Sequence, residues 1–246
     1  MLEIHCSEIW GGINVASEDV CTSGITATIH STASGAIHGG DIYYFSVCSY
    51  DVLTRVVLAD MRGHGEEAAE LSGWLYKLLL EFMNSTDGAG ILRGLNEKIV
   101  ERGFRALTTA VVLSFNRLDR TLFYANAGHP PPLAWSAKSG WNNLHMIDSL
   151  GPANLPLGIK SNTHYDQASQ TLAPGDRLFL YSDGITECPN ANGDFFDEDR
   201  LLRLLDENKN EELHVLKQEL KENLEAFSGG QLLHDDCTFL CFEVRS

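Results

Sequence analysis

The alternation of apolar and polar positions divides the chain into runs typical of strands and of helices. Residues 52–59 form a β-branched run that stops at Asp60, and residues 25–32 and 42–48 have the same strand character. Further strands are predicted at 108–115, 121–126, 132–135, 141–147, 177–182 and Thr238–Val244. The Pro174-Gly175-Asp176 turn introduces the strand at 177–182.

Helical spacing of apolar residues appears in two early and two late segments. The first helix is predicted to follow Gly65, with apolar positions at Ala68, Leu71, Leu75, Leu78, Leu79 and Phe82. The other three contain Ile91, Leu95 and Ile99, then Leu201–Leu205, then Leu213–Phe227. Residues 104–182 show no convincing helical period, which disfavours a strictly alternating α/β fold. The pattern predicts an α+β fold with antiparallel sheets.

Composition narrows the class of protein. The 246 residues contain 43% hydrophobic and 21% charged residues, as in an ordinary globular protein, and no repeat or linker divides them. We therefore expect one domain, 1–246. A net charge of −16 disfavours nucleic acid and anionic membranes as partners. No apolar run approaches the ~18 residues of a spanning helix. Six cysteines without a CxxC pair, and no signal peptide, predict a cytoplasmic protein with reduced thiols.

Aspartates recur beside glycine at the ends of predicted strands. Asp41 follows Gly39-Gly40, Asp183 precedes Gly184, Asp60 ends an apolar run, and Asp235-Asp236 stand before the last strand. Each could simply cap a turn. If these strand ends converge, however, the carboxylates would repel one another unless they were protonated or bound to cations. Oxygen ligands suit Mg²⁺ or Mn²⁺ better than Zn²⁺.

Five motifs in order carry a family resemblance. They are Gly39-Gly40-Asp41, Asp60-Met61-Arg62-Gly63-His64-Gly65, Asn126-Ala127-Gly128-His129-Pro130, Ser182-Asp183-Gly184 and Asp235-Asp236-Cys237-Thr238. The series, which spans about residues 38–244, resembles the bacterial PPM (protein phosphatase 2C-like) enzymes, and within them the SpoIIE-type regulators of sporulation and stress response. The resemblance implies a four-layer α-β-β-α sandwich of two antiparallel sheets flanked by helices, with two divalent cations, Mn²⁺ or Mg²⁺, at one edge.

The resemblance also implies a ligand set and leaves other residues open. Carried over by motif, Asp60 bridges the two metals, and Asp183 and Asp235 ligate the first metal. The Met61 carbonyl ligates the second metal, and Asp41 belongs to the shell of that metal. Asp236 is a further candidate ligand. Tyr44 stands where many relatives have another aspartate. Arg62 is a phosphate-binding candidate by adjacency only, and His64 is favoured as a structural residue. Glu187 is interpreted as a capping or hydrogen-bonding residue, and the role of His129 stays open.

The function implied by the resemblance is that of a metal-dependent protein serine/threonine phosphatase. A metal-bridging water would attack phosphorus in line, without a covalent phosphoenzyme. The implied substrate is phosphoserine or phosphothreonine on a regulatory protein, and an anti-sigma-factor antagonist is one candidate. Regulation could come from a partner or from a homodimer. The alternative is a catalytically weak or inactive interaction module of a partner-switching pathway. A cysteine phosphatase is excluded because no cysteine has an arginine six positions later.

Overall fold

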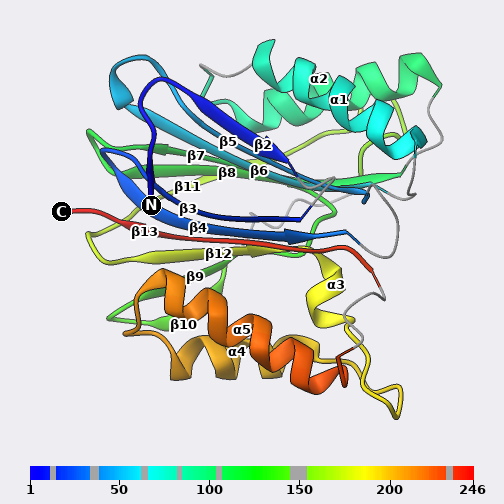
Figure 1. Ribbon diagram of the computed structural model, residues 1–246. Helices are drawn as coiled ribbons and strands as arrows, with labels where there is room; N and C mark the ends of the chain where they lie inside the picture. The colour runs from blue at the N-terminus through cyan, green and yellow to red at the C-terminus, as the bar shows by residue number, and fades with distance from the viewer. Residues whose placement is uncertain are drawn as a thin grey trace.

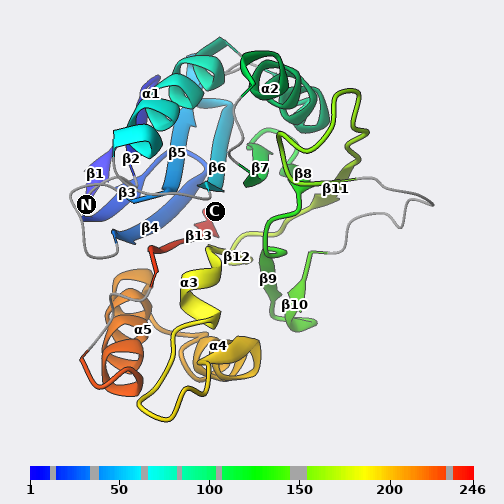
Figure 2. The ribbon, with the colours of Figure 1, turned by 90° about the vertical axis from the view of Figure 1, so that its right-hand side faces the viewer.

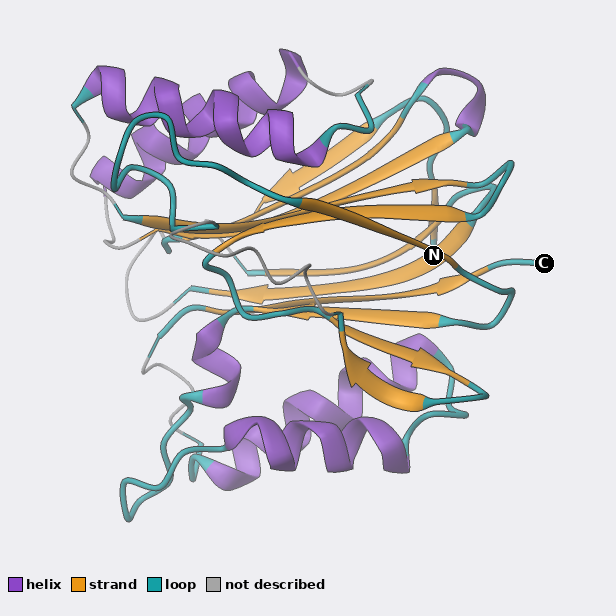
Figure 3. Ribbon diagram, turned by 180° about the vertical axis from the view of Figure 1, so that it is seen from behind, coloured by secondary structure: helices purple, strands orange, loops and turns teal. Residues whose placement is uncertain are grey.

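A computed structural model gives the structure of the protein and describes residues 1–11, 15–33, 39–61, 66–81, 85–103, 107–144, 154–230 and 235–246. Two sheets pack face to face, and helices cover the outer face of each (Figures 1 and 3). Within the described ranges, no helix is long and apolar enough to cross a membrane.

The six-stranded sheet has the order β11-β8-β7-β6-β5-β2, and all its neighbouring strands are antiparallel. Its strands are β2 (Glu8–Gly11), β5 (Asp41–Val47), β6 (Leu53–Met61), β7 (Thr108–Asn116), β8 (Thr121–Ala127) and β11 (Gln167–Thr171). A short 3-10 turn, Ser49–Asp51, joins β5 to β6. The helices α1 (Glu66–Glu81) and α2 (Gly88–Arg102) cover its outer face.

The seven-stranded sheet has the order β1-β3-β4-β13-β12-β9-β10. Its strands are β1 (Leu2–Glu3), β3 (Ala16–Cys21), β4 (Ile25–Thr32), β9 (Leu133–Ser136), β10 (Gly140–Asn143), β12 (Arg177–Tyr181) and β13 (Cys237–Val244). The helices α4 (Asp197–Glu207) and α5 (Leu213–Phe227) cover it, and the short α3 (Asp183–Thr186) follows β12. The expectation of purely antiparallel sheets is wrong at one edge, where β1 pairs in parallel with β3.

Three apolar clusters hold the layers together. The first lies between the sheets and includes Phe45, Leu58 and Phe242. The second lies under α1 and α2, and the third lies under α4 and α5. The alternation along β6 explains this arrangement, because Val56 and Leu58 face the other sheet while Val57 faces the helices. Because β6 is buried on both faces, its middle segment, residues 56–59, is apolar at every position.

The structure confirms the predicted α+β sandwich and most of its elements. The helix expected after Gly65 is α1, and the strand expected at 177–182 is β12. Five strands and helices of the described residues were not predicted from the sequence: β1, β2, β3, β11 and α3. The strand expected at 141–147 is shorter, because β10 ends at Asn143. Residues 145–147 lie outside the described residues, as do Arg62, His64 and Phe82.

Candidate functional site

Strand pairing brings the predicted acidic segments to one end of the sandwich. Asp41 begins β5 and lies directly opposite Asp60, near the end of β6. In the other sheet, Asp183 follows β12, and Asp235 precedes β13, the antiparallel neighbour of β12. Figure 2, which faces this end of the molecule, shows α3 next to the ends of β12 and β13, below the six-stranded sheet. Segments that are far apart in sequence therefore meet at one edge.

Asp41 is the most deeply buried of these acids, with 1% of its surface exposed. The Ser182 hydroxyl, which comes from the opposite sheet, donates a hydrogen bond of 2.7 Å to Asp41 Oδ2. Burial raises the pKa of Asp41 well above its ordinary value, and the nearby charge of Asp60 adds to the effect. Hydrogen bonds from Ser182 and Thr238 oppose this rise. Asp41 thus links the two sheets at the acidic edge.

The pKa of Asp60 is influenced by carboxylates of the opposite sheet. Burial raises the pKa of Asp60 to about 7, and the carboxylates of Asp183 and Asp235 add to the rise. Next to it, the Met61 amide donates a 3.1 Å hydrogen bond to the Gly40 carbonyl, which fixes the end of β6 beside the start of β5. Met61 is the last described residue before the gap at 62–65. Asp60 therefore lies beside Asp41 and within electrostatic range of Asp183 and Asp235.

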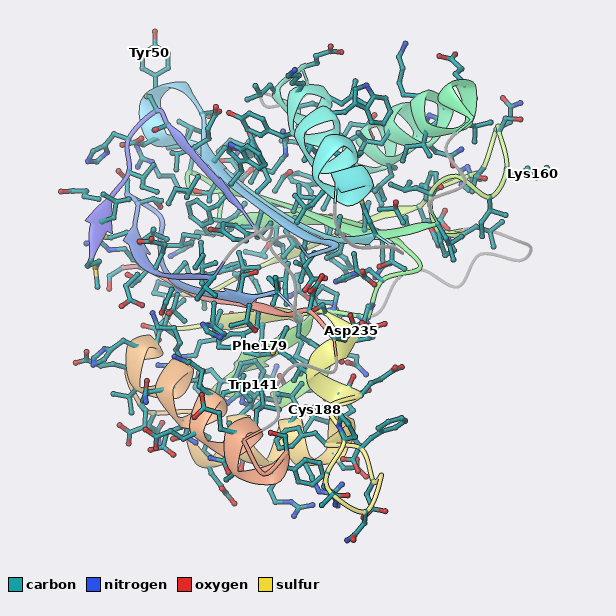
Figure 4. The ribbon with its side chains drawn as sticks, turned by 45° about the vertical axis from the view of Figure 1, so that its right-hand side comes forward. Tyr50, Trp141, Lys160, Phe179, Cys188 and Asp235 are labelled. Atoms are coloured by element: carbon teal, nitrogen blue, oxygen red, sulfur yellow. The ribbon has the colours of Figure 1, made fainter. Side chains whose placement is uncertain are left out.

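Asp183 and Asp235 form the other side of the acidic edge. Burial raises the pKa of Asp183, and the nearby charges of Glu187 and Asp235 raise it further. Asp235 is exposed and lies beside the start of α3 (Figure 4). A Cβ added at Gly184, in α3, would lie 3.4 Å from the Cβ of Asp235. The backbone N–H of Glu187 caps α3 by bonding to the Asp183 carbonyl. Glu187 is therefore a cap, as the sequence indicated, but it also adds charge to the site, which the sequence did not predict.

Asp236 has different surroundings from those of Asp235. Its side chain is buried, and its Oδ2 accepts hydrogen bonds from the backbone N–H groups of Gly40 and Asp41. A Cβ at Gly39 would lie 2.5 Å from Asp236 Oδ2, and one at Gly184 would lie 2.0 Å from the Asp236 carbonyl oxygen. Close approach of the backbone to Asp236 thus explains the glycines of two motifs, the one before Asp41 and the one after Asp183.

His129 lies in the turn after β8, near the same edge. Asn126 exchanges two hydrogen bonds with the His129 backbone, of 2.8 and 2.9 Å, around Gly128, which has a φ of 68°. Thr109, directly opposite Asp60 in the sheet, lies 2.8 Å from His129 Nδ1. Burial lowers the pKa of His129 to about 3, and the backbone of Tyr181 in the other sheet opposes this shift. A neutral, buried ring of this kind is suited to a structural link.

The chemistry of the donor set fits hard divalent cations. In the part of the chain that the structure describes, no three Asp, Glu, His or Cys side chains gather around a single point. The carboxylates are nevertheless close enough to raise one another's pKa. Mg²⁺ is typically held by one or two carboxylates and retains several waters, so two ions need no dense cluster. Divalent counter-charge would relieve the repulsion that the raised pKa values report.

Comparison with known protein families and sequences identifies similar proteins. A family model described as Stage II sporulation protein E (SpoIIE) matches residues 51–245. Phosphoserine phosphatase RsbU of Bacillus subtilis (strain 168) is 30% identical over 205 residues, which are 82% of this chain and 58% of that protein. The chain thus spans a little over half the length of this relative.

Comparison with solved structures supports the fold. The SiaA-PP2C domain of Pseudomonas aeruginosa matches with a TM-score of 0.75 and 21% identity, over 88% of this chain and 85% of that one. The crystal structure of RsbX in complex with magnesium matches with a TM-score of 0.69 and 16% identity, over 93% of this chain and 100% of that one. At these identities the likeness establishes a shared PP2C-type sandwich.

Proposed function

Because the chain belongs to the SpoIIE family of PP2C-like serine/threonine phosphatase domains, we propose that it is a metal-dependent protein phosphatase. Its substrate in this proposal is a phosphoserine or phosphothreonine on a regulatory protein of a partner-switching pathway. The similarity to a phosphoserine phosphatase, RsbU, supports the substrate class. The observation that carries the proposal is the meeting of the acidic segments of the two sheets, because Asp41 lies opposite Asp60 and the hydroxyl of Ser182, which precedes Asp183, donates a hydrogen bond to Asp41.

The proposed ligands divide between the two sheets. From the six-stranded sheet, Asp60 would bridge the ions, with the Met61 carbonyl and Asp41 on the second ion. From the seven-stranded sheet, Asp183 and Asp235 would hold the first ion. The magnesium in the related RsbX structure supports Mg²⁺ or Mn²⁺ in this role. When bound, the pair of ions would lower the pKa of a water and neutralise charge on the phosphoryl oxygens.

The chain's own residues fix the geometry that this chemistry requires. Ser182 holds the Asp41 carboxylate across the sheet interface, and the Met61–Gly40 hydrogen bond fixes Asp60 opposite Asp41. Buried neutral His129 keeps the strand of Thr109, which adjoins Asp60, against the turn after β8. These contacts orient the carboxylates before any ion binds, so little reorganisation is needed.

A hydrolysis assay tests the proposal. The wild type is incubated with an aryl phosphate and Mn²⁺, with and without a chelator, beside Asp60→Asn. We expect the chelator to abolish activity and Asp60→Asn to lower kcat/KM at least about 100-fold, since even outer-shell changes at metal sites cost about 10–100-fold. Asp206→Asn is the matched control, because Asp206 is exposed on α4 and, among the described contacts, its carboxylate bonds only to Lys209.

The alternative, a phosphatase fold that serves only as an interaction module, makes the opposite prediction. Equal rates with and without the chelator, in both the wild type and Asp60→Asn, would favour it. Retained carboxylates argue against this alternative, because burying Asp41 and Asp60 close together destabilises the fold unless they take up protons or bind an ion.

A further inference from the structure

Asp236 makes contacts that set it apart from the other acids of the site. Its Oδ2 accepts hydrogen bonds from the backbone of both Gly40 and Asp41, the latter at 3.2 Å. The same side chain is 6% exposed, whereas its neighbour Asp235 is exposed. A carboxylate that accepts two successive backbone N–H groups fixes the chain that carries them, as a capping side chain does at a helix N-terminus.

The backbone of Asp236 contacts the two other acidic segments. Its N–H donates a 2.8 Å hydrogen bond to Asp235 Oδ1, which fixes that side chain. Its carbonyl oxygen packs so closely on Gly184 that a Cβ there would lie at 2.0 Å, and the Ser182 hydroxyl is 3.4 Å from the same oxygen. One residue thus touches the segments that carry Asp41, Asp183 and Asp235.

We propose that Asp236 is a positioning residue that holds these three segments together and is not itself a ligand of an ion. The proposal rests on the proposed function, since it concerns the same site. It follows from how Asp236 is used, because its Oδ2 accepts from two backbone donors while its own N–H and carbonyl contact Asp235 and Gly184. The role requires an acceptor oxygen but no negative charge. An asparagine can supply that oxygen, as it does at helix caps.

Neighbouring substitutions with identical chemistry separate the two roles. Asp236→Asn keeps the acceptor oxygen, Asp236→Ala removes it, and Asp235→Asn removes charge from a proposed ligand. Mn²⁺ affinity is measured by electron paramagnetic resonance titration, and unfolding is measured in the presence of EDTA. We expect Asp236→Asn to bind Mn²⁺ within about threefold of wild type. Asp236→Ala should bind about 10–100-fold more weakly, and Asp235→Asn at least as weakly.

The two readouts keep this inference distinct from the proposed function. An Asp236→Asn variant that loses Mn²⁺ as completely as Asp235→Asn would overturn the positioning role and make Asp236 a ligand. Normal Mn²⁺ binding by Asp236→Ala would overturn it too. If the wild type itself bound no Mn²⁺, the proposed function would fail. The positioning role would still predict that Asp236→Ala, but not Asp236→Asn, lowers the melting temperature in EDTA.

Gly39→Ala tests the same contact from the other side while keeping every acid. The added Cβ would meet Asp236 Oδ2 at 2.5 Å, so the side chain must leave its backbone donors. We expect Gly39→Ala to bind Mn²⁺ more weakly than the wild type, as expected for Asp236→Ala. Gly39→Ala therefore tests the contact even if the Asp236→Ala variant does not fold. Gly73→Ala is the control, since a Cβ there meets no atom within 4 Å. Unchanged Mn²⁺ affinity in Gly39→Ala would contradict the proposal.

Discussion

At the scale of single residues, Gly184 shows how a motif glycine is explained by a close approach. A Cβ at this position would lie 2.0 Å from the Asp236 carbonyl oxygen, a backbone atom that cannot move independently. We therefore expect Gly184→Ala to lower the free energy of unfolding by about 1–3 kcal/mol, as for other overpacked sites. Urea unfolding measures the change, with Gly73→Ala as a helix control of neutral or stabilising effect. Equal midpoints for Gly184→Ala and wild type would show that the backbone relaxes.

His30 predicts a pH dependence of stability outside the proposed metal site. It lies in β4, 4% exposed, with its ring centroid 5.3 Å from that of Phe239. Burial lowers the pKa of His30 to about 4, and the charges of Lys221 and Lys217 add to this. Between about pH 6.5 and pH 4 the unfolded chain binds a proton at His30 that the folded chain does not bind. Stability therefore falls as the pH drops through this window, by up to about 1.4 kcal/mol per pH unit.

Comparison of the wild type with His30→Phe isolates this contribution. Urea unfolding at pH 7 and pH 5 should show a larger loss of stability in the wild type than in the variant, because phenylalanine carries no titrating group. Contributions from His129 and the carboxylates are common to both proteins and cancel in the difference. An identical loss of stability in both proteins would mean that His30 is protonated in the folded state at pH 5.

At the scale of elements, one side-chain hydrogen bond supports the backbone bridge between Ala110 of β7 and Gly128 in the turn after β8. Thr109 Oγ1 lies 2.8 Å from Nδ1 of His129, whose ring is buried. Thr109→Val has nearly the same shape but no hydroxyl, so a buried ring nitrogen loses its partner. We expect a loss of about 1–3 kcal/mol in the free energy of unfolding. Thr109→Ser keeps the hydroxyl and should lose clearly less; the reverse order in urea unfolding would assign the effect to packing of the methyl group.

The elements that the sequence predicted are those with strong apolar patterns. β6 and α5 were predicted because a β-branched run and a helical stripe are local properties. β11, with the sequence Gln-Ala-Ser-Gln-Thr, carries almost no apolar signal and is a strand only because β8 offers it a partner. The parallel pairing of β1 with β3 likewise depends on the tertiary fold. Such edge strands are determined by pairing and not by their own composition.

In the candidate site, too, some features are predicted by local sequence and others depend on the tertiary fold. Asp41, Asp60 and Asp183 could be selected from sequence because each stands at a strand end next to a turn. That they face one another follows from strand order and register, which no local pattern contains. The dual role of Glu187 and the backbone contacts of Asp236 also became visible only in three dimensions. Sequence thus predicts the candidate ligands, and the fold identifies what positions them.

At the scale of the whole molecule, charge opposes folding in the absence of ions. The chain has a net charge of −16, and its acidic edge adds local repulsion among buried carboxylates. Monovalent salt screens charges that are exposed to solvent, but it acts much less on buried groups. Divalent ions that bind only the folded state should therefore stabilise the protein well beyond the effect of ionic strength alone.

This difference predicts a specific thermal shift. Mn²⁺ at about 100 times its dissociation constant adds about 2.7 kcal/mol to the stability of the folded state. For a chain of this length, that corresponds to an increase of about 5–10 °C in the melting temperature. Differential scanning fluorimetry with MnCl₂, beside NaCl of equal ionic strength, measures it. Asp60→Asn should retain the response to NaCl and lose most of the response to Mn²⁺, because in the proposed site Asp60 would contact both ions. Equal shifts with the two salts would show that Mn²⁺ acts by screening alone, and would leave the acidic edge without a resident ion.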